Sequence, residues 1–248
     1  MLKGVKSINP NVSAIFYYNS VLDFDQYRLH AMMLADPSLM LHDTAGKVIK
    51  QGGGHKTSDV FDFTNPATRA LFIEECINAT KSGYVDGCFC DRAVDGTPSD
   101  SGNDQVPCGG AGAKPCHMNI SGTKAAAYAA GHVQVLTDLQ TALGEGPVIA
   151  NHAYGAPHDN MAAGSVGFAM DEFFNADNAS INTLLLSAAN GRGVQAHGKP
   201  TEDMLAAFLI GAGYRAYYGA PSTAIVLHVY ASCLLYVYTE CPCSLQLV

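Results

Sequence analysis

The stretch "GTKAAAYAAGHVQVLTDLQTALGEGPVIANHA" (residues 122–153) decides the fold class that we expect for this chain. Its first part predicts a long helix that ends near Gly144, and "PVIANHA" (147–153) predicts a short apolar strand after it. Strands that alternate with helices in this way, without two-residue hairpin turns, must pair in parallel. The stretch therefore indicates an α/β sheet.

The same alternation continues on both sides of this stretch. "SAIFYYNS" (13–20) is almost continuously apolar, which is typical of a strand buried on both faces. "TNPATRALFIEECINATKSG" (64–83) predicts a helix with Thr64 or Asn65 as N-cap and Pro66 in its first turn. Further helices are expected over 1–10, 178–191 and 201–213, the last capped by Thr201. The expected strands are 13–20, 59–63, 85–91, 147–153, 165–172, 193–197 and 214–219, with a further strand or hairpin over 39–50.

A closed barrel fits this pattern better than an open nucleotide-binding sheet. The first strand runs into "YYNSVLDF" (17–24), and neither GxGxxG nor GxxxxGK[ST] occurs in the chain. The spacing of the expected strands suits a (β/α)8 TIM barrel. Because the chain opens on a helix, we expect an α/β barrel that lacks its first strand and occupies residues 1–221.

Residues 222–248 form an apolar C-terminal tail that does not continue the pattern. The tail has one charged side chain, Glu240, and shows neither the period of a helix nor that of a strand. It falls short of the about 20 apolar residues of a membrane span, His228 interrupts it, and its end is not apolar as a lipid-anchor signal requires. We expect an irregular, mispredicted or frame-shifted end, with a membrane anchor as the alternative.

The charge balance argues against two classes of partner. The chain has a net charge of −8, and only 15% of its residues are charged. Binding to nucleic acid or to an anionic membrane needs clustered Lys and Arg, and the sequence has no basic run. We therefore expect a neutral or cationic small partner, no nucleic acid and no stable membrane span.

The eight cysteines do not form the paired motifs of a zinc site. Cys88 and Cys90 share one face of a strand, where we expect buried free thiols. Cys108 and Cys116 enclose a Gly-rich loop, and we expect a disulfide between them if the compartment is oxidising. Four N-x-[ST] sequons favour a secreted glycoprotein, although no signal peptide precedes them. These sequons begin at Asn11, Asn78, Asn119 and Asn178.

The polar residues at the carboxyl ends of the strands are the candidate site, because barrel active sites lie there. Some have a structural explanation: Asp62 leads into a helix, Asp43 lies in the turn "HDTAG" (42–46), and His197 could be a core histidine. The histidines show no HxH or HExxH spacing, so we expect neither metal nor cofactor. The strand ends carry Tyr18, Asn19, His42, Asp43, Asp62, Asp91, Arg92, Asn151, His152, Tyr154, Asp171, Glu172, His197 and Tyr218.

The carboxylates in this set suit glycoside hydrolysis, which needs one protonated carboxyl and one ionised carboxylate. Asp91 ends one strand, and Asp171 and Glu172 end another. Neighbouring side chains on a strand point to opposite faces, so only one of the last two can face the barrel mouth. That acid could approach Asp91 to the about 5–5.5 Å of a retaining pair, and Arg92 would favour the ionised form of its neighbours. The tyrosines that could stack on sugar rings are Tyr18, Tyr154 and Tyr218.

A resemblance to a known family rests on "INPNVSAIFYYNSVLDF" (8–24), "DGCFCDRA" (86–93), "VIANHAYG" (148–155) and "MDEFF" (170–174). Over roughly residues 5–220 the chain resembles the glycoside-hydrolase-like barrel proteins of algae, protists and bacteria. In general pattern it is similar to the clan that contains the α-galactosidases and the galactosaminidase-type barrels. The resemblance implies a nucleophilic Asp at the end of barrel strand four and an acid/base carboxylate at the end of strand six. If the missing strand is counted as the first, these residues are Asp91 and Glu172.

We therefore expect a secreted glycoside hydrolase with Asp91 as nucleophile and Glu172 as acid/base. Glu172 is preferred because Phe173 and Phe174 can give it the drier setting that a general acid requires, while Asp171 turns away or supports. The alternatives are a catalytically inactive carbohydrate-binding barrel, and a metal-assisted hydrolase or a lyase. The expected substrate-binding residues are Tyr18, Asn19, Asp43, Arg92, Asn151, His152, Asp171, His197 and Tyr218.

Overall fold

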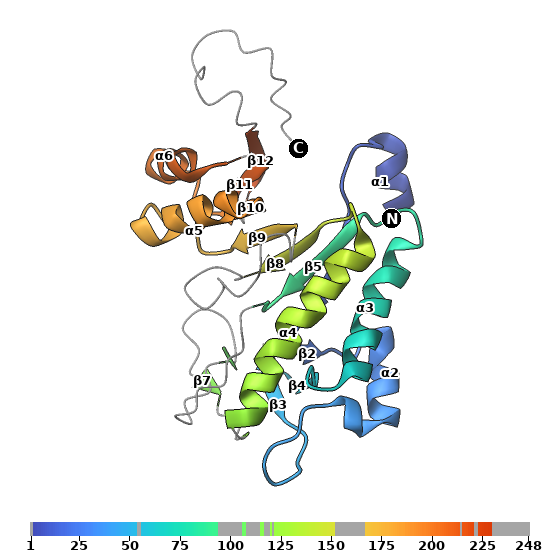
Figure 1. The fold of residues 1–248 in the computed structure, drawn as a ribbon. Coiled ribbons are helices and arrows are strands. Elements are labelled where there is room, and N and C mark those ends of the chain that lie inside the picture. Colours follow the sequence, from blue (N-terminus) through green and yellow to red (C-terminus); the bar gives the residue numbers. More distant parts are fainter. Residues whose placement is uncertain are drawn as a thin grey trace. The chain divides into compact units, whose positions relative to one another are not determined.

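The computed structural model shows parallel strands that alternate with helices (Figure 1), and this confirms the α/β class. The chain divides into two compact units, Met1–Val148 (unit 1) and Ile149–Val248 (unit 2). Closure of the strands into a barrel stays a prediction. The structure describes residues 2–53, 56–93, 106–107, 115–116, 120, 122–151, 167–213, 215–220 and 223–229.

Unit 1 is built around a parallel strand pair. Strand β1 (Ile15–Asn19) pairs with β5 (Gly87–Asp91), and the register places Asn19 opposite Asp91 at the carboxyl ends of both strands. Helices α2, α3 and α4 lie side by side in this unit (Figure 1). The helices of unit 1 are α1 (Leu2–Ile8), α2 (Arg28–Ala35), α3 (Pro66–Thr80) and α4 (Gly122–Leu143).

A separate antiparallel sheet in unit 1 corrects the expected strand order. Strand β4 (Lys56–Val60) pairs antiparallel with β2 (Leu22–Asp23) on one side and with β3 (Lys50–Gly53) on the other. The prediction that residues 59–63 form a parallel barrel strand is therefore wrong. The sequence did not reveal this sheet, because the two-residue β2 and the Gly-ending β3 have almost no side-chain pattern.

A second hairpin lies near the predicted disulfide. Strand β6 (Val106–Pro107) pairs antiparallel with β7 (Pro115–Cys116), which sets Val106 opposite Cys116. Cys108 lies outside the described residues, so its pairing with Cys116 stays a prediction.

Passage of the protein through the secretory pathway, which the N-x-[ST] sequons favour, also stays a prediction.

Unit 2 contains a run of four parallel strands, the first of which begins at the last residue of unit 1. Strands β8 (Val148–Asn151), β9 (Phe168–Asp171), β10 (Gly193–His197) and β11 (Ala216–Ala220) pair in parallel in that order, as the sequence predicts. Strand β12 (Thr223–Val229) adds to β11 in antiparallel orientation, so the first part of the expected irregular tail is a strand. Within the described part of the chain, no helix has the length and apolar character to cross a membrane. The helices of unit 2 are α5 (Asn178–Ala189) and α6 (Glu202–Gly211).

The helix starts follow the predicted capping residues. The side chain of Asn65 accepts a hydrogen bond from the backbone N–H of Ala67 at 2.9 Å and caps α3. The side chain of Thr201 accepts one from the backbone N–H of Met204 at 3.4 Å and caps α6. Each cap satisfies a backbone donor that the first helical turn leaves without a partner.

Gly131 allows α4 to lie against the segment that precedes α3. A Cβ atom at Gly131 would lie 2.0 Å from the backbone oxygen of Phe63, which is far inside the contact distance. We expect Gly131→Ala to lower the free energy of unfolding by about 2 kcal/mol, because the overlap costs about 3 kcal/mol and the gain in helix propensity is only about 1 kcal/mol. Denaturant unfolding measures this. Gly4→Ala in α1 is the control, since a Cβ there meets nothing within 4 Å, and an equal loss in both variants would contradict the explanation.

Candidate active site

The β1–β5 pair has one face toward α3 and one face away from it. Tyr18 is 0% exposed, and its ring stacks on Phe72 of α3 with the centroids 4.2 Å apart. Cys88 and Cys90 lie on the same face as free, buried thiols, as predicted. Because side chains alternate along a strand, Tyr17 and Asp91 lie on the opposite face. The α3 side is core, and the opposite side carries the candidate site of unit 1.

The Asp91 carboxylate is held by donors on both of its oxygens. The hydroxyl of Tyr17 donates to Oδ2 at 2.6 Å, and the backbone N–H of Arg92 donates to Oδ1 at 2.9 Å. Arg92 has a φ of 54°, which lies in the left-handed region. For a residue with a side chain, this backbone conformation is higher in energy than the common ones. The strained backbone turns at the end of β5, where Arg92 N–H reaches the carboxylate of the residue before it.

The backbone of Asp91 is fixed as well. Ser20, which follows β1, donates to the Asp91 carbonyl oxygen from its N–H at 2.8 Å and from its hydroxyl at 2.7 Å. Nε2 of the buried His132 in α4 lies 3.1 Å from the same hydroxyl oxygen. Because the Ser20 hydroxyl gives its hydrogen to Asp91, Nε2 of His132 is the donor in that contact. The end of β5 is thus tied to β1 and, through Ser20, to α4.

The two residues that donate to the Asp91 carboxylate, Tyr17 and Arg92, both have shifted pKa values. Burial raises the pKa of Tyr17 well above its ordinary value, and the hydrogen bond to Asp91 and its charge raise that pKa further. Tyr17 therefore keeps its proton and acts as a donor. Burial lowers the pKa of Arg92, and the negative charge of Asp91 opposes that change. The Nη1 atom of Arg92 is buried and has no hydrogen-bond partner among the described residues.

Two residues predicted to bind substrate in unit 1 have structural roles. Tyr18 is fully buried against α3, so the expectation that it stacks on a sugar ring is wrong; Tyr17, one residue earlier, is 47% exposed on the Asp91 side. Asn19 is 2% exposed, and its Oδ1 accepts hydrogen bonds from the N–H groups of Val21 and Leu22 at 3.0 and 2.8 Å. The Asn19 side chain therefore holds the turn after β1, and this is its role instead of the expected direct contact with substrate.

Glu172 in unit 2 is grouped with two other predicted residues. The side-chain amide of Asn151, at the end of β8, donates to Oε2 of Glu172 at 3.0 Å. His197, at the end of β10, lies in the electrostatic field of Glu172; burial lowers the pKa of His197, and the Glu172 charge opposes this. His197 is half-buried and not a core residue. A neutral imidazole and an amide are therefore among the groups near this carboxyl at neutral pH.

Asp171 and Tyr218 belong to the helix side of the unit 2 sheet. Asp171 is 2% exposed and pairs in register with Ala196, a core residue, and its Oδ1 accepts from the N–H of Phe173 at 3.2 Å. Asp171 therefore lies on the helix side of the sheet, and its expected contact with substrate stays a prediction. Tyr218 is a core residue packed on Phe208, and its hydroxyl donates to the backbone of Lys199, so it is not the predicted sugar platform.

The expected dry setting of Glu172 does not come from its aromatic neighbours. Phe173 is 49% exposed, and Phe174 packs into the unit 2 core against Phe208. Glu172 itself is half-buried. Asn151 and His197 are among the groups that set its environment.

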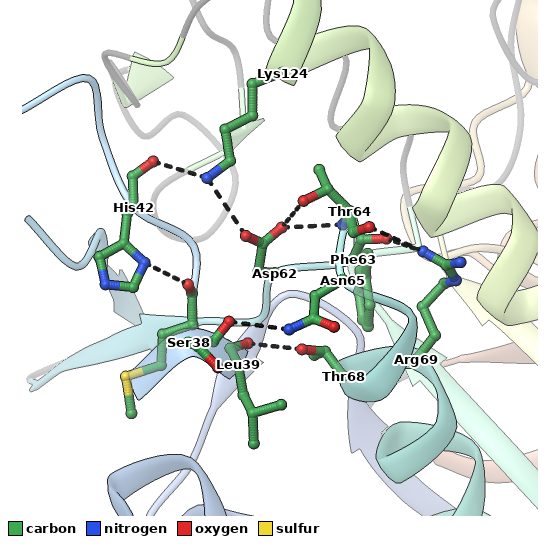
Figure 2. A network of polar contacts seen from close by, with 11 residues as sticks. Ser38, Leu39, His42, Asp62, Phe63, Thr64, Asn65, Thr68, Arg69 and Lys124 are labelled. Carbon is green, nitrogen blue, oxygen red and sulfur yellow. Dashed lines mark hydrogen bonds and ion pairs between the residues drawn. The ribbon is translucent and has the colours of Figure 1, made fainter. Parts of the chain in front are cut away.

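Asp62 and Asp43 are structural residues. In Figure 2, Asp62 lies between Thr64, whose N–H and hydroxyl donate to Oδ1 at 3.0 and 2.6 Å, and Lys124, whose ammonium lies 3.4 Å from Oδ2. Lys124 also donates to the backbone oxygen of His42 at 3.3 Å. Oδ1 of Asp43 accepts hydrogen bonds from two backbone N–H groups, those of Ala45 and Lys47. Asp43 therefore forms a turn, which corrects its assignment as a substrate-binding residue.

The predicted roles of His152 and Tyr154 stay predictions. His152 and Tyr154 lie outside the described residues. Within the described ranges, no three His, Cys, Asp or Glu side chains come together so that they could hold a metal ion.

Comparisons with known proteins show the family and the fold of the chain. A family model described as hypothetical glycosyl hydrolase family 15 matches residues 6–233. The chain is similar to the glycoside hydrolase domain of PelA from Pseudomonas aeruginosa, with a TM-score of 0.52 and 17% identity over 89% of this chain and 82% of that one. It is also similar to the cycloalternan-degrading enzyme from Trueperella pyogenes in complex with a covalent intermediate, with a TM-score of 0.53 and 14% identity over 88% of this chain and 31% of that one. At these identities the likeness shows the fold alone. No curated protein matches the chain in sequence.

Proposed function

Because the chain belongs to hypothetical glycosyl hydrolase family 15, we propose that it is a retaining glycoside hydrolase in which Asp91 is the nucleophile and Glu172 the acid/base. The observation that carries this proposal is the Asp91 carboxylate, held at a strand end by Tyr17 and by the N–H of Arg92. A nucleophilic carboxylate must be fixed in orientation, and donors on both oxygens supply this condition.

The proposed reaction has two displacements. In the first, an oxygen of Asp91 forms a bond to the anomeric carbon while the glycosidic C–O bond breaks, and Glu172 gives its proton to the departing oxygen. In the second, Glu172 takes a proton from water, the water oxygen attacks the anomeric carbon, and the electron pair of the ester C–O bond returns to Asp91. The overall products are the free sugar and the released alcohol, with both carboxyls restored.

Two further groups support a carbohydrate ligand beside these carboxyls. The buried Nη1 of Arg92 has no partner in the described part of the chain, and a buried charged donor without a partner costs about 1–3 kcal/mol or more. A substrate oxygen bound there would remove this cost. In unit 2, the neutral imidazole of His197 beside Glu172 can bind a sugar hydroxyl as donor or acceptor.

The test begins with a panel of aryl glycosides and continues on the sugar that the protein cleaves. We expect NMR of the first-formed product to show retained anomeric configuration. A 2-deoxy-2-fluoro glycoside of the same sugar should leave a covalent adduct that peptide mass spectrometry assigns to Asp91. Inversion, or an adduct on another residue, would refute the proposed mechanism. Binding of the sugar without any cleavage would favour the carbohydrate-binding alternative.

A further inference from the structure

We propose that Tyr17 is a positioning residue of the reaction, which acts on the substrate only through the Asp91 carboxylate. The inference rests on the proposed function, because it assigns the carboxylate its nucleophilic role. Tyr17 is not among the residues that the sequence marks as a site, since it lies inside a strand and next to the more buried Tyr18. Its place on the Asp91 side of the β1–β5 pair is visible only in the structure.

The contact has the geometry of a strong hydrogen bond. The hydroxyl oxygen of Tyr17 lies 2.6 Å from Oδ2 of Asp91, within the range of hydrogen bonds from a hydroxyl to an ionised carboxylate. The ring of Tyr17 stacks on Phe89, with centroids 5.8 Å apart and planes at 26°. Phe89 is the register partner of Tyr17 and lies two residues before Asp91 on β5. The ring is thus fixed on the strand that carries the carboxylate it binds.

The second donor completes the restraint. The N–H of Arg92 holds Oδ1, so Tyr17 and Arg92 together fix the rotation of the carboxylate about its bond to the side chain. The Arg92 donor belongs to the backbone and cannot be removed by an ordinary substitution. The Tyr17 donor is a single hydroxyl, and Tyr17→Phe removes it while the ring that stacks on Phe89 remains.

Tyr17 should act in both displacements. In the first step it keeps the attacking carboxylate in one orientation. In the second step the electron pair of the ester C–O bond returns to the carboxylate, and the Tyr17 hydroxyl stabilises the charge that forms there. We therefore expect Tyr17→Phe to lower kcat by about 10- to 100-fold, the effect of one hydrogen bond to a charged group, with a much smaller change in KM.

A double-mutant cycle with azide separates this role from a purely structural one. Asp91→Gly removes the carboxylate, and azide can take its place as nucleophile to give a glycosyl azide of inverted configuration. If Tyr17 acts through Asp91, Tyr17→Phe should reduce turnover about 10- to 100-fold in the native background but less than about threefold in the azide-rescued Asp91→Gly background. Tyr18→Phe is the matched control. It removes the same atom from the adjacent residue, whose buried hydroxyl has no partner among the described residues.

Three results distinguish the possible failures. Normal turnover of Tyr17→Phe would overturn the positioning role and leave the proposed function intact. An equal loss in the native and azide-rescued backgrounds would show that Tyr17 acts on the substrate or on the fold directly, which also overturns the inference. Full activity of Asp91→Gly without azide would refute the proposed function itself, and the positioning role with it.

Discussion

Replacing Asp91 by Asn should abolish most of the turnover on any glycoside that the intact protein cleaves. The amide keeps the size of the side chain and can still accept a hydrogen bond from Tyr17, but it lacks the negative charge that forms the covalent bond. We expect kcat/KM to fall by at least about 1,000-fold, as is usual when a residue of the covalent machinery is removed. Initial rates on the best aryl glycoside of the panel measure this.

Asp62→Asn is the matched control for this prediction, because it makes the same chemical change in the same unit. Asp62 supports the start of α3 through Thr64 and pairs with Lys124. The substitution should therefore lower stability while kcat/KM stays within about threefold of the native value, since Asp62 has no place in the proposed mechanism. If Asp91→Asn keeps near-native turnover, or if both variants lose activity equally, Asp91 is not the nucleophile.

The sequence predicted the elements of the fold better than their order. The caps Asn65 and Thr201 were found because capping depends on a few neighbouring residues. Pairing depends on distant segments, and the expected strand at 59–63 was placed in the wrong sheet. The count that made Asp91 the end of barrel strand four included this segment as strand three. The role of Asp91 therefore rests on its hydrogen bonds and no longer on that count.

On two strands the sequence did not tell which of two neighbouring tyrosines faces the helices. "SAIFYYNS" (13–20) is apolar on both faces, as a strand of a parallel sheet usually is, so the sequence carries no alternation that tells Tyr17 from Tyr18. The same ambiguity applies to Tyr217 and Tyr218, of which the second is core and the first pairs in register with Gln195. A one-residue error exchanges the two faces of a strand, and only the observed packing against a helix resolves it.

Polar strand ends were easier to find than to assign. Asp43 and Asp62 follow apolar segments as Asp91 does, yet both bind local backbone N–H groups and serve turns. Asp62 and Asp91 each have, in addition, a side-chain partner that is distant in sequence: Lys124 in α4 for Asp62 and Tyr17 in β1 for Asp91. No local pattern encodes these contacts, so the sequence alone could not tell which acid lies beside a tyrosine hydroxyl.

The acid/base role of Glu172 predicts a loss that depends on the leaving group. Glu172→Gln cannot give a proton to the departing oxygen, so glycosides with alkyl or other poor leaving groups should lose about 100- to 10,000-fold in kcat/KM. Aryl glycosides whose phenol leaves without protonation should lose less than about tenfold in the first step. A plot of log(kcat/KM) against the pKa of the leaving phenol should therefore be steeper for Glu172→Gln than for the intact protein.

The neighbouring acid supplies the control that decides this assignment. Asp171 lies on the helix side of the sheet and binds the N–H of Phe173, so Asp171→Asn should keep the native dependence on the leaving group and lose only stability. Added azide should speed Glu172→Gln, since it needs no general base in the second step, and should leave Asp171→Asn unchanged. The opposite pattern, with Asp171→Asn inactive and Glu172→Gln normal, would move the acid/base by one residue. Such a result would place the catalytic carboxyl on the helix side of the sheet, the face on which Asp171 lies by its register with Ala196.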